Sequence, residues 1–175
     1  NTKADGSGTT YTNRQSVLNL SSTHGATITL YAQWETNAYS IGFDGNGHTG
    51  GSTSGMTMKF DESKALTANG YTRTGYTFKN WNTNANGTGT TYTNRQTVRN
   101  LTSVNGGTVT LYAQWTPITY KIVFNGNGHT GGSTSEMAMT YDVAANLTEN
   151  GFRKTGYVFT GWNTEPDGSG TRYTN

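Results

Sequence analysis

The segment Thr110–Trp115, Thr-Leu-Tyr-Ala-Gln-Trp, decides how this chain is organised, because the same six residues also occur at Thr29–Trp34. The two tryptophans that close these segments are 115 − 34 = 81 positions apart. The run Gly-Asn-Gly-His-Thr-Gly-Gly-Ser-Thr-Ser recurs with the same offset, at Gly45–Ser54 and at Gly126–Ser135. Identity at a fixed spacing indicates tandem repeats. The chain is therefore an 81-residue unit that is repeated slightly more than twice.

The position of the repeats predicts one complete unit and two partial ones. Residues 39–115 run from the first strand-like segment to the closing tryptophan and form the complete unit. Residues 1–34 correspond to the back part of a preceding unit, and residues 118–175 to the front part of a following one. We therefore expect the chain to be a piece of a longer array. The unit is longer than solenoid repeats of roughly 20–50 residues, so each unit should have its own core. The proline of the short linker Thr116–Pro117 favours a stiff joint.

Hydrophobic periodicity predicts the strands of the unit. Apolar side chains alternate with polar or small ones in four segments, residues 39–43, 56–60, 75–81 and 108–115. Alternation of this kind is typical of half-buried strands. Residues 93–101 are expected to form a short helix that faces the sheet, and residues 64–69 a single helical turn. The predicted fold class is α+β to mostly β, with four to five short strands and one short helix in each unit.

Composition excludes several classes of protein. The chain has no cysteine, which excludes a disulfide framework and thiolate metal sites. The net charge is +2 and the charges are scattered, so we expect no nucleic-acid partner. No apolar run approaches the roughly 20 residues that span a bilayer, so this fragment is not expected to insert in a membrane. If the protein is exported, its signal and anchor are expected outside these residues.

Candidate catalytic and metal-binding residues are scarce. His48 and His129 are equivalent, and neither has a second histidine or a carboxylate pair nearby in the sequence. Asp44, in a segment that resembles a calcium loop only vaguely, is replaced by Asn125 in the next copy. We therefore predict no catalytic residue, no metal site and no cofactor, and the chain is not expected to be an enzyme.

Two sets of residues are candidates for other roles. The first is a ligand-contact loop that is unchanged between the copies, with His48, Thr49, Ser52, His129, Thr130 and Ser133. The alternative for this loop is that its polar side chains only hydrogen-bond their own turn. The second set is the four tryptophans, Trp34, Trp81, Trp115 and Trp162. Each ends an alternating segment, which favours packing in a core or at the seam between units over stacking on sugar rings.

Four motifs taken together resemble a known family. They are Phe-Asp/Asn-Gly-Asn-Gly, Thr-Gly-Tyr-x-Phe-x-x-Trp-Asn-Thr, Asp-Gly-Ser-Gly-Thr-x-Tyr and Leu-Tyr-Ala-Gln-Trp. This combination resembles the Listeria–Bacteroides repeat, over essentially the whole chain. The resemblance implies compact β-grasp-like modules in tandem, within large surface proteins of bacteria and some archaea. It also implies a role as a spacer or adhesive stalk module, and it supplies no catalytic residue.

Three hypotheses about function follow. The leading one is a non-enzymatic extracellular stalk or spacer in an adhesin-like protein of a microbial cell surface, whose partners are neighbouring repeats of the same chain. The first alternative is an adhesive module that binds glycans or proteins of a host or matrix. The second is a subunit of a head-to-tail extracellular filament, which would form by self-association when the open sheet of one copy accepts a strand from another.

Overall fold

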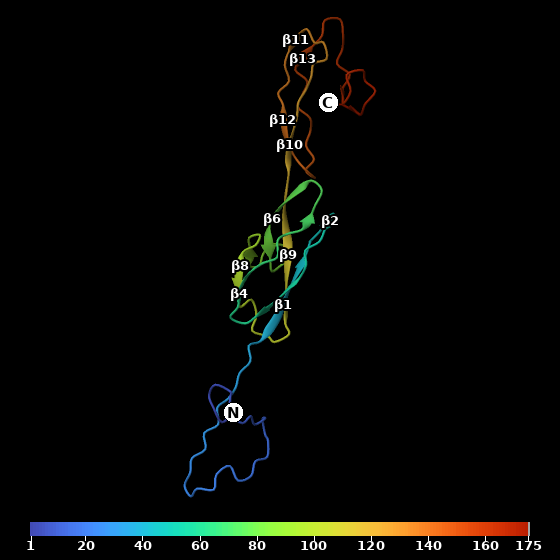
Figure 1. Cartoon of the computed structure of the whole chain (residues 1–175). Coiled ribbons are helices and arrows are strands. Elements are labelled where there is room, and N and C mark those ends of the chain that lie inside the picture. The colour runs from blue at the N-terminus through green and yellow to red at the C-terminus, as the bar shows by residue number, and fades with distance from the viewer. Residues whose placement is uncertain (175) are drawn as a thin grey trace.

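The computed structural model describes residues 1–174, and in this part the chain forms strands, turns and extended segments without any helix. The strands are β1 (Ala38–Asp44), β2 (Gly50–Gly51), β3 (Met56–Lys59), β4 (Ser63–Ala65), β5 (Tyr71–Thr72), β6 (Tyr76–Asn82), β7 (Thr91–Tyr92), β8 (Thr97–Arg99), β9 (Thr108–Pro117), β10 (Thr119–Ile122), β11 (Gly131–Gly132), β12 (Met137–Thr140), β13 (Phe152–Arg153), β14 (Trp162–Asn163) and β15 (Arg172–Tyr173). Figure 1 shows the N-terminal part, the central unit and the C-terminal part of the chain following one another along one long axis.

The central part of the chain forms a five-stranded sheet with the order β3-β1-β9-β6-β7. Strands β1 and β9 lie side by side and parallel, although the whole unit separates them in the sequence. Every other neighbouring pair in the sheet is antiparallel. Two small antiparallel pairs, β2-β5 and β4-β8, complete the unit. Strand β9, the last strand of the unit in the sequence, therefore lies in the middle of the sheet and joins β1 to β6.

The core of the unit lies against this sheet and follows the alternation of the sequence. Its buried members are Tyr39, Ile41, Met58, Leu66, Trp81, Val98, Leu111 and Ala113. Aromatic rings extend the core around Trp81. The distance between ring centroids is 4.7 Å from Trp81 to Phe43 and 5.0 Å from Trp81 to Phe78. Removing this much apolar surface from water is the main stabilising contribution that a small unit of this kind has.

The C-terminal part repeats the local pairings of the central unit but has no equivalent of its main sheet. Its three antiparallel pairs are β10-β12, β11-β13 and β14-β15. The first two stand 81 positions after β1-β3 and β2-β5, and the third repeats the pairing of β6 with β7. Within residues 1–174, no strand pairs with the edge of β10 that corresponds to the β9 side of β1.

The N-terminal part, residues 1–37, contains turns but no strand. The segment Thr29–Trp34 lies in this part without strand pairing, although its six residues are identical to Thr110–Trp115 of β9. One hydrogen-bonded loop does form there, around Asn1. Its side-chain amide donates to the carbonyl oxygens of Gly6 and Gly8 at 3.0 and 3.1 Å.

The expected fold class is wrong in two respects. Residues 93–101 form a turn and β8 rather than a helix, and residues 64–69 begin in β4. Strand β8 pairs with β4, so the apolar spacing of Val98 and Leu101 reflects a short strand and its following turn. Without a helix to cover the sheet, the β-grasp expectation also fails in the described residues. The unit is mostly β, with small sheets.

The predicted unit boundaries, 1–34, 39–115 and 118–175, stay a prediction. The main sheet spans Ala38–Pro117, close to the expected complete unit. The last residue of the third range, Asn175, lies outside the described residues.

Candidate functional site

The loop that is unchanged between the repeats is folded back on its own unit. His48 packs against the ring of Tyr71 in a tilted geometry, with 4.6 Å between the ring centroids. The backbone N–H of Thr49 donates to the carbonyl oxygen of Thr72 at 2.8 Å, and its hydroxyl accepts from the N–H of Thr74 at 2.9 Å. Farther along, the hydroxyl of Thr53 accepts from the N–H of Gly70 at 2.9 Å. We call residues 48–54 with their equivalents 129–135 the clasp loops.

The second clasp loop repeats these contacts. His129 packs against Phe152 in the same tilted geometry, with 4.6 Å between the ring centroids, and the hydroxyl of Thr130 accepts from the N–H of Thr155 at 3.0 Å. The hydroxyl of Thr134 accepts from the N–H of Gly151 at 2.9 Å. The interaction partners change between copies from Tyr71 to Phe152, but the packing does not change.

Close backbone packing explains why the glycines of the clasp loops are unchanged. Gly51 has a φ of +76°, and a Cβ there would lie 2.0 Å from the carbonyl oxygen of Gly70. Gly132 has the same relation to Gly151, also at 2.0 Å. Only glycine fits such an approach between two backbones. The identity of the run between copies therefore has a structural cause, independent of any ligand.

The predicted ligand-contact residues stay a prediction. His48, Thr49 and Ser52 are exposed, as are their equivalents His129, Thr130 and Ser133. The structure brings the first two of each set together with β5 or β13. Ser52 and Ser133 lie on the loop where their carbonyl oxygens approach Gly70 and Gly151. The hydroxyls of Thr49 and Thr130 already accept hydrogen bonds from the backbone N–H groups of Thr74 and Thr155, which follow β5 and β13.

The four tryptophans occupy different environments. Trp81 is fully buried at the centre of the core. Trp115 is half-buried and donates from Nε1 to the carbonyl oxygen of Gly45 at 2.9 Å. Trp162 is half-buried against Phe124, with 4.6 Å between the ring centroids. Trp34 lies in the linker before β1, at the seam between parts, and is 90% exposed.

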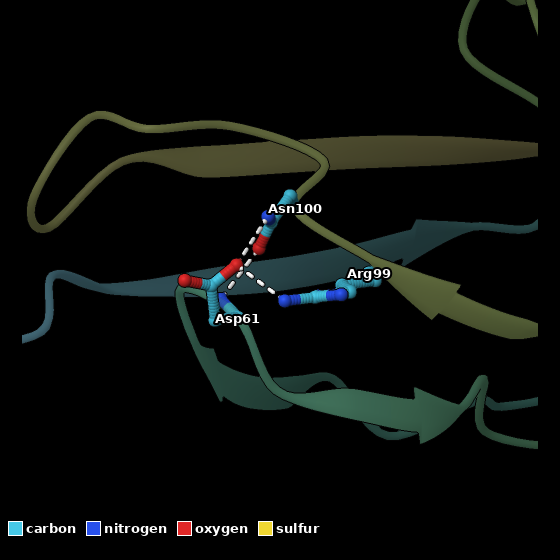
Figure 2. A network of polar contacts seen from close by, with 3 residues as sticks. All are labelled: Asp61, Arg99 and Asn100. Carbon is cyan, nitrogen blue, oxygen red and sulfur yellow. Dashed lines mark hydrogen bonds and ion pairs between the residues drawn. The ribbon is translucent and has the colours of Figure 1, made fainter.

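A polar network closes the turn between β3 and β4 (Figure 2). One carboxylate oxygen of Asp61 accepts from Arg99 at 2.7 Å and from the side-chain amide of Asn100 at 2.9 Å. The side-chain oxygen of Asn100 in turn accepts from the backbone N–H of Asp61. The Asn100 hydrogen bond, with help from Arg99, lowers the pKa of the Asp61 carboxyl. This network ties the end of β8 to the turn between β3 and β4.

The junction between the central unit and the C-terminal part is nearly continuous strand. Strand β9 ends at Pro117 and β10 begins at Thr119, with only Ile118 between them. The N–H of Ile118 donates to the carbonyl oxygen of Gly75 at 2.9 Å, in the central unit. Its own carbonyl oxygen accepts from the N–H of Tyr141 at 2.9 Å, in the C-terminal part. One residue is therefore bonded to both sides of the junction.

Side chains also cross this junction. The hydroxyl of Tyr76 donates to a carboxylate oxygen of Asp142 at 2.8 Å. The rings of Tyr76 and Tyr141 meet edge to face, with centroids 5.8 Å apart, and the guanidinium of Arg73 lies 4.0 Å from the Tyr76 ring centroid. The hydrogen bond to Asp142 raises the pKa of the Tyr76 phenol, because it stabilises the protonated form and places a negative charge beside it.

Sequence reasoning missed these junction residues. One signal was available in the sequence, in the pair of acidic residues that follows the second predicted strand of the repeat. The pair Asp61-Glu62 becomes Asp142-Val143 in the next copy, so the aspartate is kept while the neighbouring acid is lost. An aromatic residue precedes the aspartate both times, as Phe60 and as Tyr141. The kept aspartate serves the junction, where Asp142 accepts the Tyr76 hydroxyl.

The sequence pattern of the Listeria-Bacteroides repeat domain matches residues 39–114 and 120–175. The chain belongs to the Listeria–Bacteroides repeat family. The resemblance of the four motifs is thereby confirmed, and both matched ranges begin at the first strand of a repeat.

Two relatives come from Evansella cellulosilytica. One, whose name describes it as a Gly-rich membrane protein, is 38% identical over 165 residues, which is 93% of this chain and 18% of the relative. The other, named as a membrane protein, is 30% identical over 146 residues, which is 82% of this chain and 20% of the relative. The chain thus spans about a fifth of each of them. No solved structure matches the chain.

Membership of this family and the names of both relatives fit a repeat of a surface-associated protein. Neither name refers to a catalytic activity. Among the described residues, no three His, Asp or Glu side chains gather where they could hold a metal ion. Residues 1–174 also contain no helix with the length and apolar character needed to cross a membrane.

Proposed function

We propose that this chain is a non-enzymatic spacer in the extracellular stalk of a microbial surface protein. The observation that carries the proposal is the junction at Ile118, which is hydrogen-bonded to the units on both sides. A joint of one residue, preceded by a proline and bonded on both sides, leaves few free backbone dihedrals between consecutive units. Units joined in this way hold a distal domain at a set distance from the cell.

The arrangement of the chain supports the same function. The N-terminal part, the central sheet and the C-terminal part follow one another along a single axis, with β9 and β10 running along it (Figure 1). The complete repeat has its own buried core, so the array lengthens by whole units. Kinship with relatives named as membrane proteins, of which this chain spans a small share, is consistent with repeats in a larger surface protein.

Small-angle X-ray scattering on the 175-residue chain, with light scattering for mass, tests the proposal. We expect an elongated monomer with about the mass of the sequence, 18.9 kDa. Inserting Gly-Ser-Gly-Ser between Thr116 and Pro117 should broaden the distribution of dimensions. The same insertion after Gly25, where no side chain lies near, is the control. A compact wild-type particle, or equal effects of the two insertions, would contradict the stalk.

The adhesive and filament hypotheses remain predictions. A glycan array probed with the whole chain tests the first, with His48→Ala as the variant that should lose any signal that the clasp loop provides. The filament hypothesis has one feature in its favour, since the edge of β10 away from β12 is unpaired in the described residues. It requires that the mass measured by light scattering grow with protein concentration.

A further inference from the structure

The junction after the central unit holds one tyrosine between two repeats. Tyr76 begins β6, lies opposite Pro117 in the sheet, and reaches over the joint to Tyr141 and Asp142. It follows Gly75, whose φ is +76°. A Cβ at Gly75 would lie 2.2 Å from the ring of Tyr141, so the glycine lets the two units approach closely. The turn therefore presents its phenol to the next repeat.

The junction before the central unit has an equivalent position, but within residues 1–174 no tyrosine occupies it. A depression of about 280 Å³ opens there, lined by Trp34, Glu35, Thr36, Asn37, Phe60, Asp61 and Ser103. Three of these residues, Thr36, Phe60 and Asp61, stand 81 positions before the three that lie against Tyr76 at the other junction. We call this depression the socket.

The socket has a hydrogen-bond acceptor available for a phenol. Asp61 uses one carboxylate oxygen for both Arg99 and Asn100. Its other oxygen receives no hydrogen bond from residues 1–174. At the occupied junction, an oxygen of the equivalent Asp142 takes the Tyr76 hydroxyl. Phe60 supplies the aromatic edge that Tyr141 supplies there.

The far end of the chain carries a second tyrosine of the same kind. Tyr157 follows Gly156 in an identical Thr-Gly-Tyr turn and is 71% exposed. The ammonium group of Lys154 lies 4.7 Å from its ring centroid, as Arg73 lies over Tyr76. A Cβ at Gly156 would meet nothing within 4 Å, so this end is open where Gly75 is covered.

We propose that consecutive repeats recognise each other through this tyrosine. The Thr-Gly-Tyr turn of one repeat seats its phenol between the aromatic-Asp pair and the linker of the next. The socket at Phe60-Asp61 takes the tyrosine of a preceding repeat, and Tyr157 enters the socket of a following one. The inference rests on the stalk function, because it requires repeats joined in series, and it names the side chains that fix their relative orientation.

The first test compares Tyr76→Phe with Tyr157→Phe in the full chain. Both changes remove one hydroxyl and keep the ring, but Tyr76 hydrogen-bonds Asp142 of the next repeat, whereas Tyr157 is 71% exposed. Residual dipolar couplings report the orientation of the C-terminal part relative to the central unit. We expect a loss of mutual alignment in Tyr76→Phe and none in Tyr157→Phe. Equal behaviour of the two variants would overturn the proposal.

The second test fills the empty socket. A copy of residues 72–81 is fused directly before Asn1, which is the natural register because Asn1 is equivalent to Asn82. We expect the added tyrosine to give nuclear Overhauser contacts to Phe60, and its phenol to titrate above the ordinary tyrosine pKa of about 10. The same extension with phenylalanine in place of tyrosine is the control for the ring alone. An added tyrosine without contacts to Phe60 would contradict the socket.

The two proposals fail in different ways. An elongated wild-type chain whose alignment is unchanged by Tyr76→Phe would keep the stalk and remove the tyrosine contact. A wild-type chain whose two parts show no common alignment at all would remove both.

Discussion

The segments Thr110–Trp115 and Thr29–Trp34 have the same six residues and different structures. In the central unit the segment is the middle of β9, between β1 and β6, and Leu111 is 0% exposed. In the N-terminal part it is not a strand, and Leu30 is 47% exposed. The local sequence is therefore insufficient to form this strand. The strand exists where two partners flank it, because pairing and burial supply what propensity alone does not.

A comparison of the central unit with the C-terminal part leads to the same conclusion. Tyr39 in β1 is 1% exposed, whereas its equivalent Tyr120 in β10, which has no strand on the corresponding edge within residues 1–174, is 45% exposed. Yet the aromatic cluster forms in both, since Trp162 meets Phe124 and Phe159 at nearly the distances that Trp81 meets Phe43 and Phe78.

Short-range features are likewise independent of the sheet. Asn82, Asn163 and Asn1 each donate from the side-chain amide to two loop carbonyl oxygens, five and seven residues on. The loops held by these asparagines, the clasp loops and the aromatic cluster are thus local properties of the repeat. The part of the core around Leu111, on β9, is the part that needs the complete unit.

The largest expected effect is that of Trp81→Ala. Deleting this fully buried indole should destabilise the central unit by about 3–5 kcal/mol. Trp34→Ala, at the most exposed tryptophan, should stay within about 0.5 kcal/mol. Denaturation followed by the NMR signals of residues 38–117 measures both. Equal effects would mean that the difference in burial between the two regions is not real.

Leu111→Ala and Leu30→Ala test the identical segments directly. The first should cost about 2–5 kcal/mol because it leaves a cavity under β9. The second should leave the stability of the central unit unchanged, since Leu30 lies outside its core. A destabilisation of the central unit by Leu30→Ala would show that the N-terminal segment contributes to a sheet after all.

Gly75→Ala and Gly156→Ala sharpen the comparison at the junctions. Both glycines have positive φ, so each alanine carries a strain of about 1–2 kcal/mol. Only at Gly75 does the added methyl group also meet the ring of Tyr141. We therefore expect Gly75→Ala to disturb the amide signals of Tyr141 and Ile118, and Gly156→Ala to leave them in place. Similar spectra for both variants would show that the junction is not close-packed.

The smallest expected effect is a loss of stability of the junction at alkaline pH. The pKa of Tyr76 is raised by its hydrogen bond to Asp142, so the folded junction holds this proton more tightly than the unfolded chain does. The contribution is present below the ordinary tyrosine pKa of about 10 and is lost as the pH rises through the raised value. Titration of the tyrosine ring carbons measures it. In Asp142→Asn the Tyr76 midpoint should move down, and an unchanged midpoint would assign the shift to another cause.

The sequence predicted the repeat, its family and the four main strands, because each depends on local alternation or on identity at a fixed offset. It failed at residues 93–101, where an apolar spacing of three residues fits a helix but arises from β8 and the turn after it. It could not place Tyr76 beside Asp142, because this contact joins residues 66 positions apart across a junction. The clasp loops were correctly singled out as unchanged, but the cause of their identity lies in the approach of Gly51 to Gly70, which no spacing reveals.

The parallel pairing of β1 with β9 has a mechanical consequence. Tension along the array would enter the unit at Ala38 and leave it at Pro117, through two strands that lie next to each other. Because the strands are parallel, the load pulls them in opposite directions along their shared ladder. The evenly spaced hydrogen bonds between them then resist in shear, all together, instead of opening one after another like a zipper. A repeat connected in this way resists unfolding by a force that acts along the array.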